Sequence, residues 1–238
     1  MCVVKNDRKT HYRTQFKFRI MPLIIAVAHQ KGGVGKSTLA LNLVSFFNRN
    51  GATSAVVDAD AQGSISSLIS SFGENDAYGT VNLIPRKSFK SFSDLTQFDQ
   101  YQVLLIDTPP YLSTNLNEIF QIADFVLVPT KPAVFDMFAI EGTVELINEA
   151  KKLKPDLRMG VVLNMSTPGA KHVEDIKTHL RGKGIKLLDT EINKRVEFER
   201  CLLYSDSIFS GNDEKAKDEI SRLGNEIIAL IEDESVVN

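Results

Sequence analysis

The run from residue 30 to residue 38 has the composition of a loop that binds phosphate groups. It reads Gln30-Lys31-Gly32-Gly33-Val34-Gly35-Lys36-Ser37-Thr38. An apolar run precedes it and a helical pattern follows it. Backbone N–H groups in such a setting converge on a phosphate chain at the helix N-terminus. Lys36 then reaches the β- and γ-phosphates and the Ser37 hydroxyl ligates Mg²⁺.

Carboxylates stand at the ends of two other apolar runs. Residues 54–58 lead to Asp58 and Asp60, and residues 101–107 lead to Asp107, which is followed closely by two prolines. Ligands of parallel α/β sheets bind at the carboxyl ends of the strands, so we expect these acids beside the phosphate loop. Asp107 would hold Mg²⁺ directly or through water, and Asp58 would be structural. Asp60 would lie beside the bound phosphates, or alternatively its carboxylate would only cap the N-terminus of the next helix.

The elements that must position these groups alternate along the chain. Apolar runs predict strands at 23–28, 54–58, 101–107, 123–130, 158–165 and 186–190. Stripes at helical spacing predict helices at 36–50, 64–71, 137–153, 170–183 and 213–232. We therefore expect an α/β fold, with a doubly wound, mostly parallel sheet and helices on both faces, as in P-loop NTPases. Residues 86–90 form a basic, aromatic-spaced loop, which is either merely solvated or in contact with nucleic acid.

The bulk composition is that of a globular protein with no global preference for nucleic acid. The chain has 238 residues and a net charge of −2, so any DNA binding must come from a local patch. Cys2 and Cys201 are far apart, which argues against a disulfide framework and a paired-thiolate metal site and fits a reducing cytoplasm. No apolar run reaches membrane-spanning length.

We expect two parts in the chain. Residues 1–20 carry six Lys or Arg against one Asp and read as a basic N-terminal extension, disordered or an arm, ahead of Met21. The alternative is a basic arm that touches DNA or lipid. Residues 21–238 form a single ATPase domain.

The chemistry-bearing residues resemble those of the ParA/MinD superfamily, whose phosphate loop is a deviant Walker A motif. The second lysine, Lys31, is its signature, and Gln30 stands where the standard loop has glycine. Asp60 belongs to a segment like the family's Asp-x-Asp-Pro-Gln-Gly, with Ala61 in place of proline. Asp107 opens an Asp-Thr-Pro-Pro segment close to the family's Asp-x-Pro-Pro. The resemblance covers about residues 22–231.

The resemblance implies roles for individual residues, with ATP and Mg²⁺ as cofactors. Lys31, Lys36 and Asp60 would be catalytic: Lys31 crosses to the nucleotide of a second subunit, and Asp60 orients the attacking water. Residues 31–38 would bind ATP, with Ser37 and Asp107 at the metal. Asn164 stands where the family hydrogen-bonds adenine, although asparagine is also common in turns. Asn193 stands where the family commonly has a proline on the adenine side of the nucleotide pocket.

The family's function then implies a nucleotide-dependent homodimer switch in plasmid or chromosome partitioning. Such a dimer would bind double-stranded DNA non-specifically, be stimulated by a ParB-like activator, and be cytoplasmic and nucleoid-associated. Residues 151–200 hold twelve Lys or Arg and seven acids, a local charge of +5, and Lys194, Arg195 and Arg200 are our candidates for DNA contact. The alternative is that these charges are ordinary solvated helix faces.

Other functions of the same superfamily stay open. A MinD-like membrane switch would need a basic amphipathic C-terminal helix, whereas the chain after Ile231 is acidic. A positioning ATPase for a non-DNA cargo fits the same motifs. An iron–sulfur carrier would need paired cysteines, and a dethiobiotin-synthetase-like ligase does not normally have the lysine at position 31.

Overall fold

The computed structural model describes residues 21–60, 63–71, 81–110, 114–203 and 207–233. The predicted extension at 1–20, Ala61 and the acidic end beyond Asp233 lie outside these residues.

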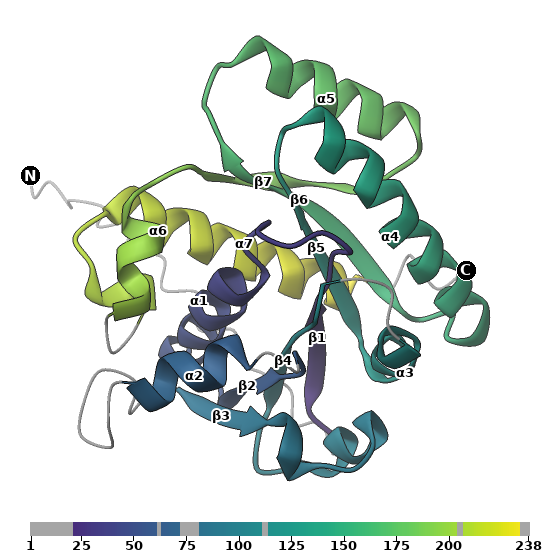
Figure 1. Ribbon diagram of the computed structural model, residues 1–238, viewed down its shortest axis with the longest axis vertical. Helices are drawn as coiled ribbons and strands as arrows, with labels where there is room; N and C mark the ends of the chain where they lie inside the picture. The colour runs from purple at the N-terminus through teal and green to yellow at the C-terminus, as the bar shows by residue number, and fades with distance from the viewer. Residues whose placement is uncertain (1–20, 61–62, 72–80, 111–113, 204–206, 234–238) are drawn as a thin grey trace, which may run out of the picture.

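Seven strands form one sheet, in the order β3-β2-β4-β1-β5-β6-β7, and all of its pairings are parallel (Figure 1). The strands are β1 Leu23–Val27, β2 Ser54–Asp58, β3 Asn82–Pro85, β4 Val103–Asp107, β5 Phe125–Thr130, β6 Arg158–Ser166 and β7 Leu187–Asn193. The predicted doubly wound parallel α/β fold is confirmed. The order reverses at β1, so the phosphate loop that follows β1 starts at the switch point of the sheet, where ligands bind in such folds.

Helices cover both faces of the sheet. They are α1 Lys36–Arg49, α2 Ser64–Ser71, α3 Thr114–Ile122, α4 Val134–Leu153, α5 Lys171–Gly182, α6 Glu197–Arg200 and α7 Glu214–Glu232. Short 3-10 turns complete the list: η1 Arg86–Ser88, η2 Phe92–Gln97, η3 Cys201–Leu203 and η4 Ser207–Ser210. Figure 1 shows α1, α2 and α7 on one side of the strands and α3, α4 and α5 on the other.

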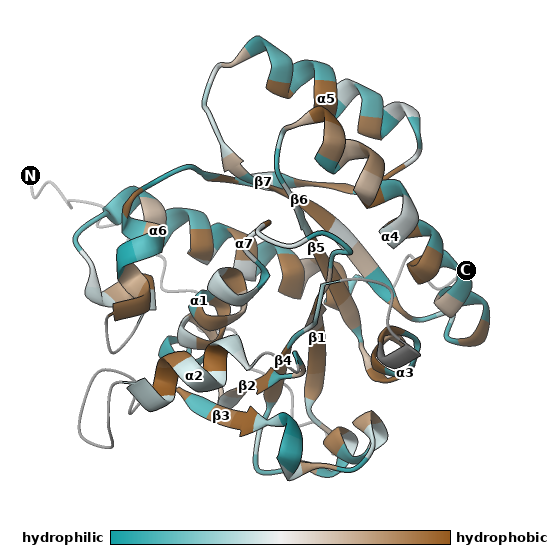
Figure 2. Cartoon of the chain, viewed as in Figure 1, coloured by the Kyte–Doolittle hydropathy of each residue, from teal (hydrophilic) through white to brown (hydrophobic). Residues whose placement is uncertain are grey.

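Two hydrophobic cores follow from the alternation of side chains along the strands. In β1, Ile25 packs with α1 and α7, whereas its neighbours Ile24 and Ala26 pack with α3, α4 and α5. Successive strand residues point to opposite faces, so a continuous apolar strand fills both cores at once. Figure 2 shows this as apolar strands between helices whose outer faces are hydrophilic.

The clearest differences from the expectation concern two elements and two boundaries. The sequence did not indicate β3, a short edge strand in which only Ile84 is buried, or α3. Helix α4 begins at Val134 rather than 137, directly after the extended residue Ala133. Strand β7 continues to Asn193 rather than ending at 190, because its pairing with β6 resumes beyond a register shift.

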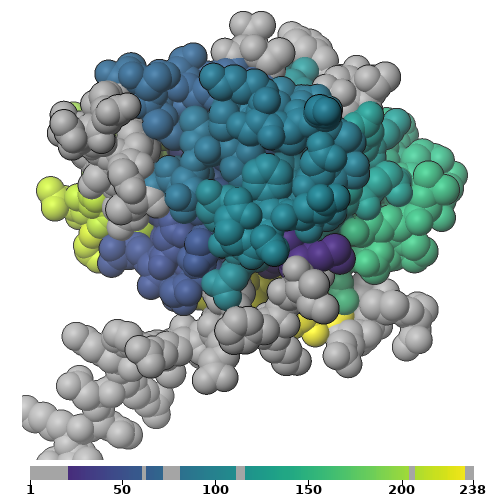
Figure 3. All heavy atoms as spheres, turned by 90° about the horizontal axis from the view of Figure 1, so that it is seen from below, coloured from purple at the N-terminus to yellow at the C-terminus, as the bar shows by residue number. Residues whose placement is uncertain are grey.

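The basic loop expected at 86–90 is folded onto the protein. The Arg86 guanidinium lies 4.7 Å from the ring centre of Phe89 and 4.9 Å from that of Phe92, and it donates to the Phe89 carbonyl. Turn η2 then starts with Ser91 and Asp94 as a reciprocal cap. In the view from below, the teal segment that contains η1 and η2 covers the middle of the surface (Figure 3). The green part of the chain, from about residue 150 onward, lies at one side.

Carboxylates of α7 bind the main chain of the edge strand β7. Glu226 accepts from the N–H groups of Asp189 and Thr190, at 2.7 and 2.9 Å, beside the shift in the pairing register. Glu219 accepts from the N–H of Asn193 at 3.0 Å. Backbone N–H groups without a ladder partner must find another acceptor, and here α7 supplies it.

Candidate functional site

The phosphate loop joins β1 to α1 and takes a conformation that glycine permits. Gly33 and Gly35 have φ angles of 72° and 92°, in the left-handed region that side chains with a Cβ rarely adopt. A Cβ at Gly35 would also overlap the side-chain amide of Asn164. The Asn164 Nδ2 donates to the Val34 carbonyl at 2.7 Å, so β6 holds the loop from outside. The first turn of α1 follows without a side-chain cap.

Lys36 and Ser37, the first residues of α1, lie beside Asp107 at the end of β4. The Ser37 Oγ donates to Asp107 Oδ2 at 2.6 Å. Lys36 is only 8% exposed, and burial lowers the pKa of its amine, while the nearby charges of Asp107 and Asp60 act in the opposite direction. The structure therefore brings together the lysine, the hydroxyl and the acid that the sequence predicted.

Two buried carboxylates lie side by side at the carboxyl ends of the neighbouring strands β2 and β4. Asp58 and Asp107 are partners in the pairing of β2 with β4 and are 1% and 2% exposed. In each, Oδ1 is buried without a hydrogen-bond partner within the described ranges. Burial raises the pKa of Asp107 to about 7, opposed by the Ser37 hydrogen bond and the charge of Lys36, with Asp58 and Asp60 raising it further.

These unpartnered oxygens fit a divalent cation at this position. Hard carboxylate and hydroxyl oxygens are the ligands that Mg²⁺ takes in proteins, and a cation would offset the cost of burying the charge of Asp107. Asp58 also accepts from the N–H and hydroxyl of Ser66, at 2.8 and 2.7 Å, which fixes the start of α2. The structural role expected for Asp58 is thus visible, and its free Oδ1 is a feature that sequence reasoning missed.

Asp60 lies two residues beyond the end of β2, close enough for its charge to act on both Lys36 and Asp107. It lines an open pocket of about 770 Å³ between α2, β3 and η1, together with Asp58 and Gly63. Its placement beside the phosphate loop agrees with the expectation. Its action on a water molecule stays a prediction.

The amine of Lys31 is paired outside the cradle that Lys36 and Ser37 form. Its Nζ lies 3.1 Å from Asp136 Oδ2 in the first turn of α4; the side chains are 43% and 8% exposed. The same helix holds the loop again through the Thr143 hydroxyl, which accepts from the N–H of Gln30 at 3.3 Å. The pairing of Lys31 with Asp136 was not predicted, because an acid on a later helix has no fixed spacing from the loop.

The candidates for DNA contact lie in the segment from the end of β7 to η3. Arg195 is engaged by Glu219 at 2.7 Å and Asp213 at 3.4 Å, which raises the pKa of its guanidinium further. Lys194 and Arg200 are exposed. The adenine contact of Asn164 and the DNA contacts stay predictions.

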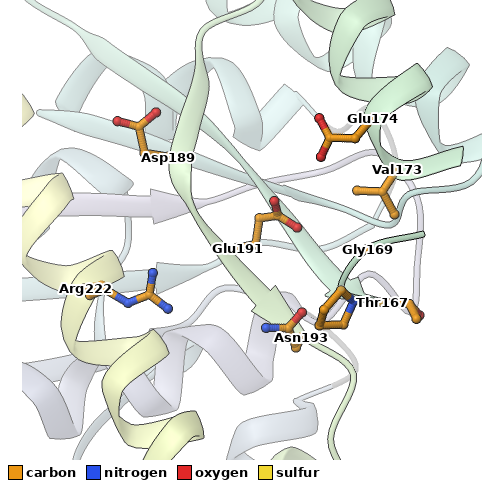
Figure 4. Close-up of a pocket in the computed structure, with 9 residues that line it drawn as sticks. Thr167, Gly169, Val173, Glu174, Asp189, Glu191, Asn193 and Arg222 are labelled. Carbon is orange, nitrogen blue, oxygen red and sulfur yellow. The ribbon is translucent and has the colours of Figure 1, made fainter. Parts of the chain in front are cut away.

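A second hollow, of about 290 Å³, opens beside β7 (Figure 4). Its charged lining is Glu174 from α5, Asp189 and Glu191 from β7, and Arg222 from α7. Lys177 pairs with both Glu174 and Glu191, and Ser166 donates to Glu191, so these two acids already have partners within the chain.

None of the helices in the described ranges is long and apolar enough to cross a membrane.

The parallel sheet and the glycine loop at its switch point define a P-loop nucleotide-binding protein. The family model described as "CobQ/CobB/MinD/ParA nucleotide binding domain" matches residues 25–208, and the chain belongs to this family. The suspected membership of the ParA/MinD superfamily is confirmed.

Named relatives within this family have different cargoes. The chain is 27% identical over 208 residues to maintenance of carboxysome distribution protein A of Halothiobacillus neapolitanus, covering 86% of this chain and 95% of that protein. It is 25% identical over 202 residues to the chromosome-partitioning ATPase Soj of Thermus thermophilus, covering 72% and 81%. A Borrelia burgdorferi protein described as a "putative plasmid partition protein", solved bound to AMPPNP, shares the fold, with a TM-score of 0.66, 20% identity and coverage of 87% of this chain and 99% of that chain.

Proposed function

We propose that the protein is an ATP-hydrolysing dimer switch that acts in the partitioning of DNA. The observation that carries this proposal is the presence of two lysines with separate surroundings. Lys36 is buried beside Asp107, whereas the amine of Lys31 is half-exposed and paired with Asp136 outside the cradle. One amine is placed for the nucleotide bound to its own chain, and the other is free to exchange partners.

The residues of the site have separate roles in phosphoryl transfer. In this reaction, positioning and charge neutralisation matter more than covalent chemistry. The loop amides and Lys36 bind the β- and γ-phosphates, and Ser37 and Asp107 would hold Mg²⁺, with the buried Asp58 next to Asp107 in the sheet. Mg²⁺ supplies charge neutralisation across the phosphates. Asp60 aligns water on the γ-phosphate. Asn164 keeps the loop in place and approaches the base.

An apolar surface beside Lys31 supports association of two copies. Val134, Phe135 and Phe138 on the first turns of α4 are 58%, 81% and 61% exposed, next to Asp136. Large exposed apolar groups that gather on one element are typical of interaction surfaces. When the γ-phosphate is present, Lys31 leaves Asp136 for the nucleotide of the second copy, and contacts that exist only in that state drive the association.

The similarity to Soj and to a plasmid partition protein favours DNA as the cargo. In this function the ATP dimer binds duplex DNA non-specifically, with Lys194 and Arg200 exposed for phosphate contact, and a ParB-like partner stimulates slow turnover. The protein is then cytoplasmic and nucleoid-associated. A second candidate is a positioning ATPase for another large cargo, which the similarity to a carboxysome distribution protein favours. Both candidates share the switch.

The test is made in three stages on the purified full chain. Calorimetry with Mg·ATP measures binding, and light scattering with AMPPNP measures dimers; Lys31→Ala should bind nucleotide and stay monomeric. A gel shift on random duplex DNA across a salt series should give binding that needs nucleotide and falls steeply with salt. Absence of Mg·ATP binding, or persistent Lys31→Ala dimers, contradicts the switch. Nucleotide-dependent binding to anionic vesicles but not DNA favours a MinD-like function instead.

A further inference from the structure

His29 lies between the end of β1 and the phosphate loop, outside the residues of the proposed nucleotide site. It is 1% exposed, and its Nδ1 accepts a hydrogen bond from the backbone N–H of Lys31 at 2.9 Å. Because the accepting nitrogen carries no proton, the proton of the neutral ring is on Nε2. Nε2 is buried and has no hydrogen-bond partner in the part of the chain that the structure describes. A polar ring is thus buried where its Nδ1 can hold the Lys31 main chain.

The main chain of Lys31 is held by buried groups on both sides, whereas its side chain is not. Its N–H donates to His29, and its carbonyl accepts from Lys36 Nζ at 3.4 Å. The amine at the other end of the side chain is in the half-exposed ion pair with Asp136. The backbone origin of Lys31 is therefore fixed, while its amine can move from one partner to another.

We propose that His29 is a positioning residue for Lys31: the acceptor on its Nδ1 fixes the backbone from which the Lys31 amine reaches the nucleotide of a second copy. This inference rests on the proposed function, in which Lys31 acts across the dimer. A side chain with a fixed origin loses less freedom when it binds, so the hydrogen bond strengthens the dimer contact. Nucleotide binding within one chain depends chiefly on Lys36, Ser37 and the loop N–H groups that follow Lys31, so it changes little.

The ring keeps this acceptor at neutral pH. Burial and the positive charge of Lys36 lower the pKa of His29 to about 4, with Asp136 acting in the opposite direction and Lys31 lowering it slightly further. The ring is then neutral wherever ATP-dependent switching is measured near pH 7. A protonated Nδ1 would be a donor and could not accept from Lys31.

Two amide variants separate the acceptor from the bulk of the ring. His29→Asn puts an oxygen on the same Cγ that carries Nδ1, so it keeps an acceptor for the Lys31 N–H. His29→Gln fills more of the ring's volume but moves the oxygen one bond further out. For each variant, calorimetry gives the affinity of the monomer for Mg·AMPPNP, and sedimentation gives the dimer dissociation constant at saturating nucleotide.

We expect the Gln variant to raise the dimer dissociation constant at least tenfold and the Asn variant to stay within threefold of wild type. The monomer affinity for Mg·AMPPNP should stay within threefold in both. Equal dimer constants for Asn and Gln, or a parallel loss of nucleotide binding and dimerisation, overturn the inference. If the wild-type protein forms no nucleotide-dependent dimer, or Lys31→Ala dimerises normally, the proposed function itself fails, and the inference fails with it.

Discussion

Lys31, at the start of the phosphate loop, and Asp136, in the first turn of α4, form an ion pair of 3.1 Å in which the acid is almost fully buried and the amine is not. The pair ties the loop to the helix that carries the exposed Phe135 and Phe138. Under the proposed function it must open before a dimer forms. It therefore couples the position of Lys31 to the surface that a second copy would cover.

Asp136→Asn tests this coupling. Loss of the carboxylate frees the Lys31 amine, so we expect the AMPPNP dimer to become tighter by up to about fivefold, the range that a partly exposed ion pair allows. The fold should lose about 0.5–1 kcal/mol, since Asp136 also lies at the positive end of α4. Glu149→Gln, which breaks an exposed pair with Lys152 on the same helix, is the control and should leave dimerisation unchanged. Weaker dimers in Asp136→Asn would contradict the coupling.

The apolar surface of α4 gives a second prediction. Phe135→Ser should weaken the nucleotide-dependent dimer by about tenfold, because it removes a large apolar side chain from the proposed contact. Leu153→Ser is matched to it: Leu153 is 79% exposed at the other end of the same helix. Light scattering over a concentration series with AMPPNP measures both. An equal effect of the two substitutions would show that general surface hydrophobicity, not this site, drives association.

Gly35→Ala should abolish nucleotide binding while the rest of the fold survives. Alanine disfavours a φ of 92°, and its Cβ would overlap Asn164, so the loop must leave the conformation that presents its N–H groups. Gly182→Ala at the end of α5 is the control, because a Cβ there meets nothing within 4 Å. We expect the control to bind Mg·ATP normally. Calorimetry decides between the two outcomes.

The pH dependence of stability contains two opposing contributions in the protein without metal or nucleotide. His29 has a pKa lowered to about 4, so its contribution is present above its unfolded value of 6.5 and is lost as pH falls through 4, on the order of 3 kcal/mol. Asp107 has a pKa raised to about 7, so its contribution is present below 3.8 and is lost as pH rises through 7, on the order of 4 kcal/mol.

Single variants separate these two contributions. In Asp107→Asn the unfolding free energy should rise between pH 4 and 6.5, because the effect of His29 remains. In His29→Asn it should fall between pH 4 and 7, because the effect of Asp107 remains. Urea unfolding at a series of pH values gives both curves. Parallel curves for the two variants would show that one of the pKa directions is wrong.

The fold and the grouping of Lys36, Ser37 and Asp107 could be predicted because both depend on patterns that are contiguous in the sequence. The apolar strands, the glycine loop at 30–38 and the acids that end β2 and β4 have fixed local spacing, and parallel topology brings the strand ends to one edge. The short edge strand β3 was missed because it buries only Ile84 and so has no apolar run.

Contacts between distant segments could not be predicted in the same way. Asp136 reads as one acid on a later helix, and its contact with Lys31 depends on where α4 places it. Arg195 reads as an exposed basic residue, yet Glu219 and Asp213 of a later segment hold it. Only the packing of α4 and α7 against the sheet fixes these partners.

The carboxylates that α7 places along β7 also determine how copies of this protein can meet. A bare outer strand would offer its N–H groups to any extended chain and could seed continuous sheets between molecules. Glu226 and Glu219 already take the N–H groups of Asp189, Thr190 and Asn193. That flank is therefore poorly suited to open-ended stacking of sheets between molecules, and under the proposed function two copies would meet at the exposed apolar residues of α4 instead.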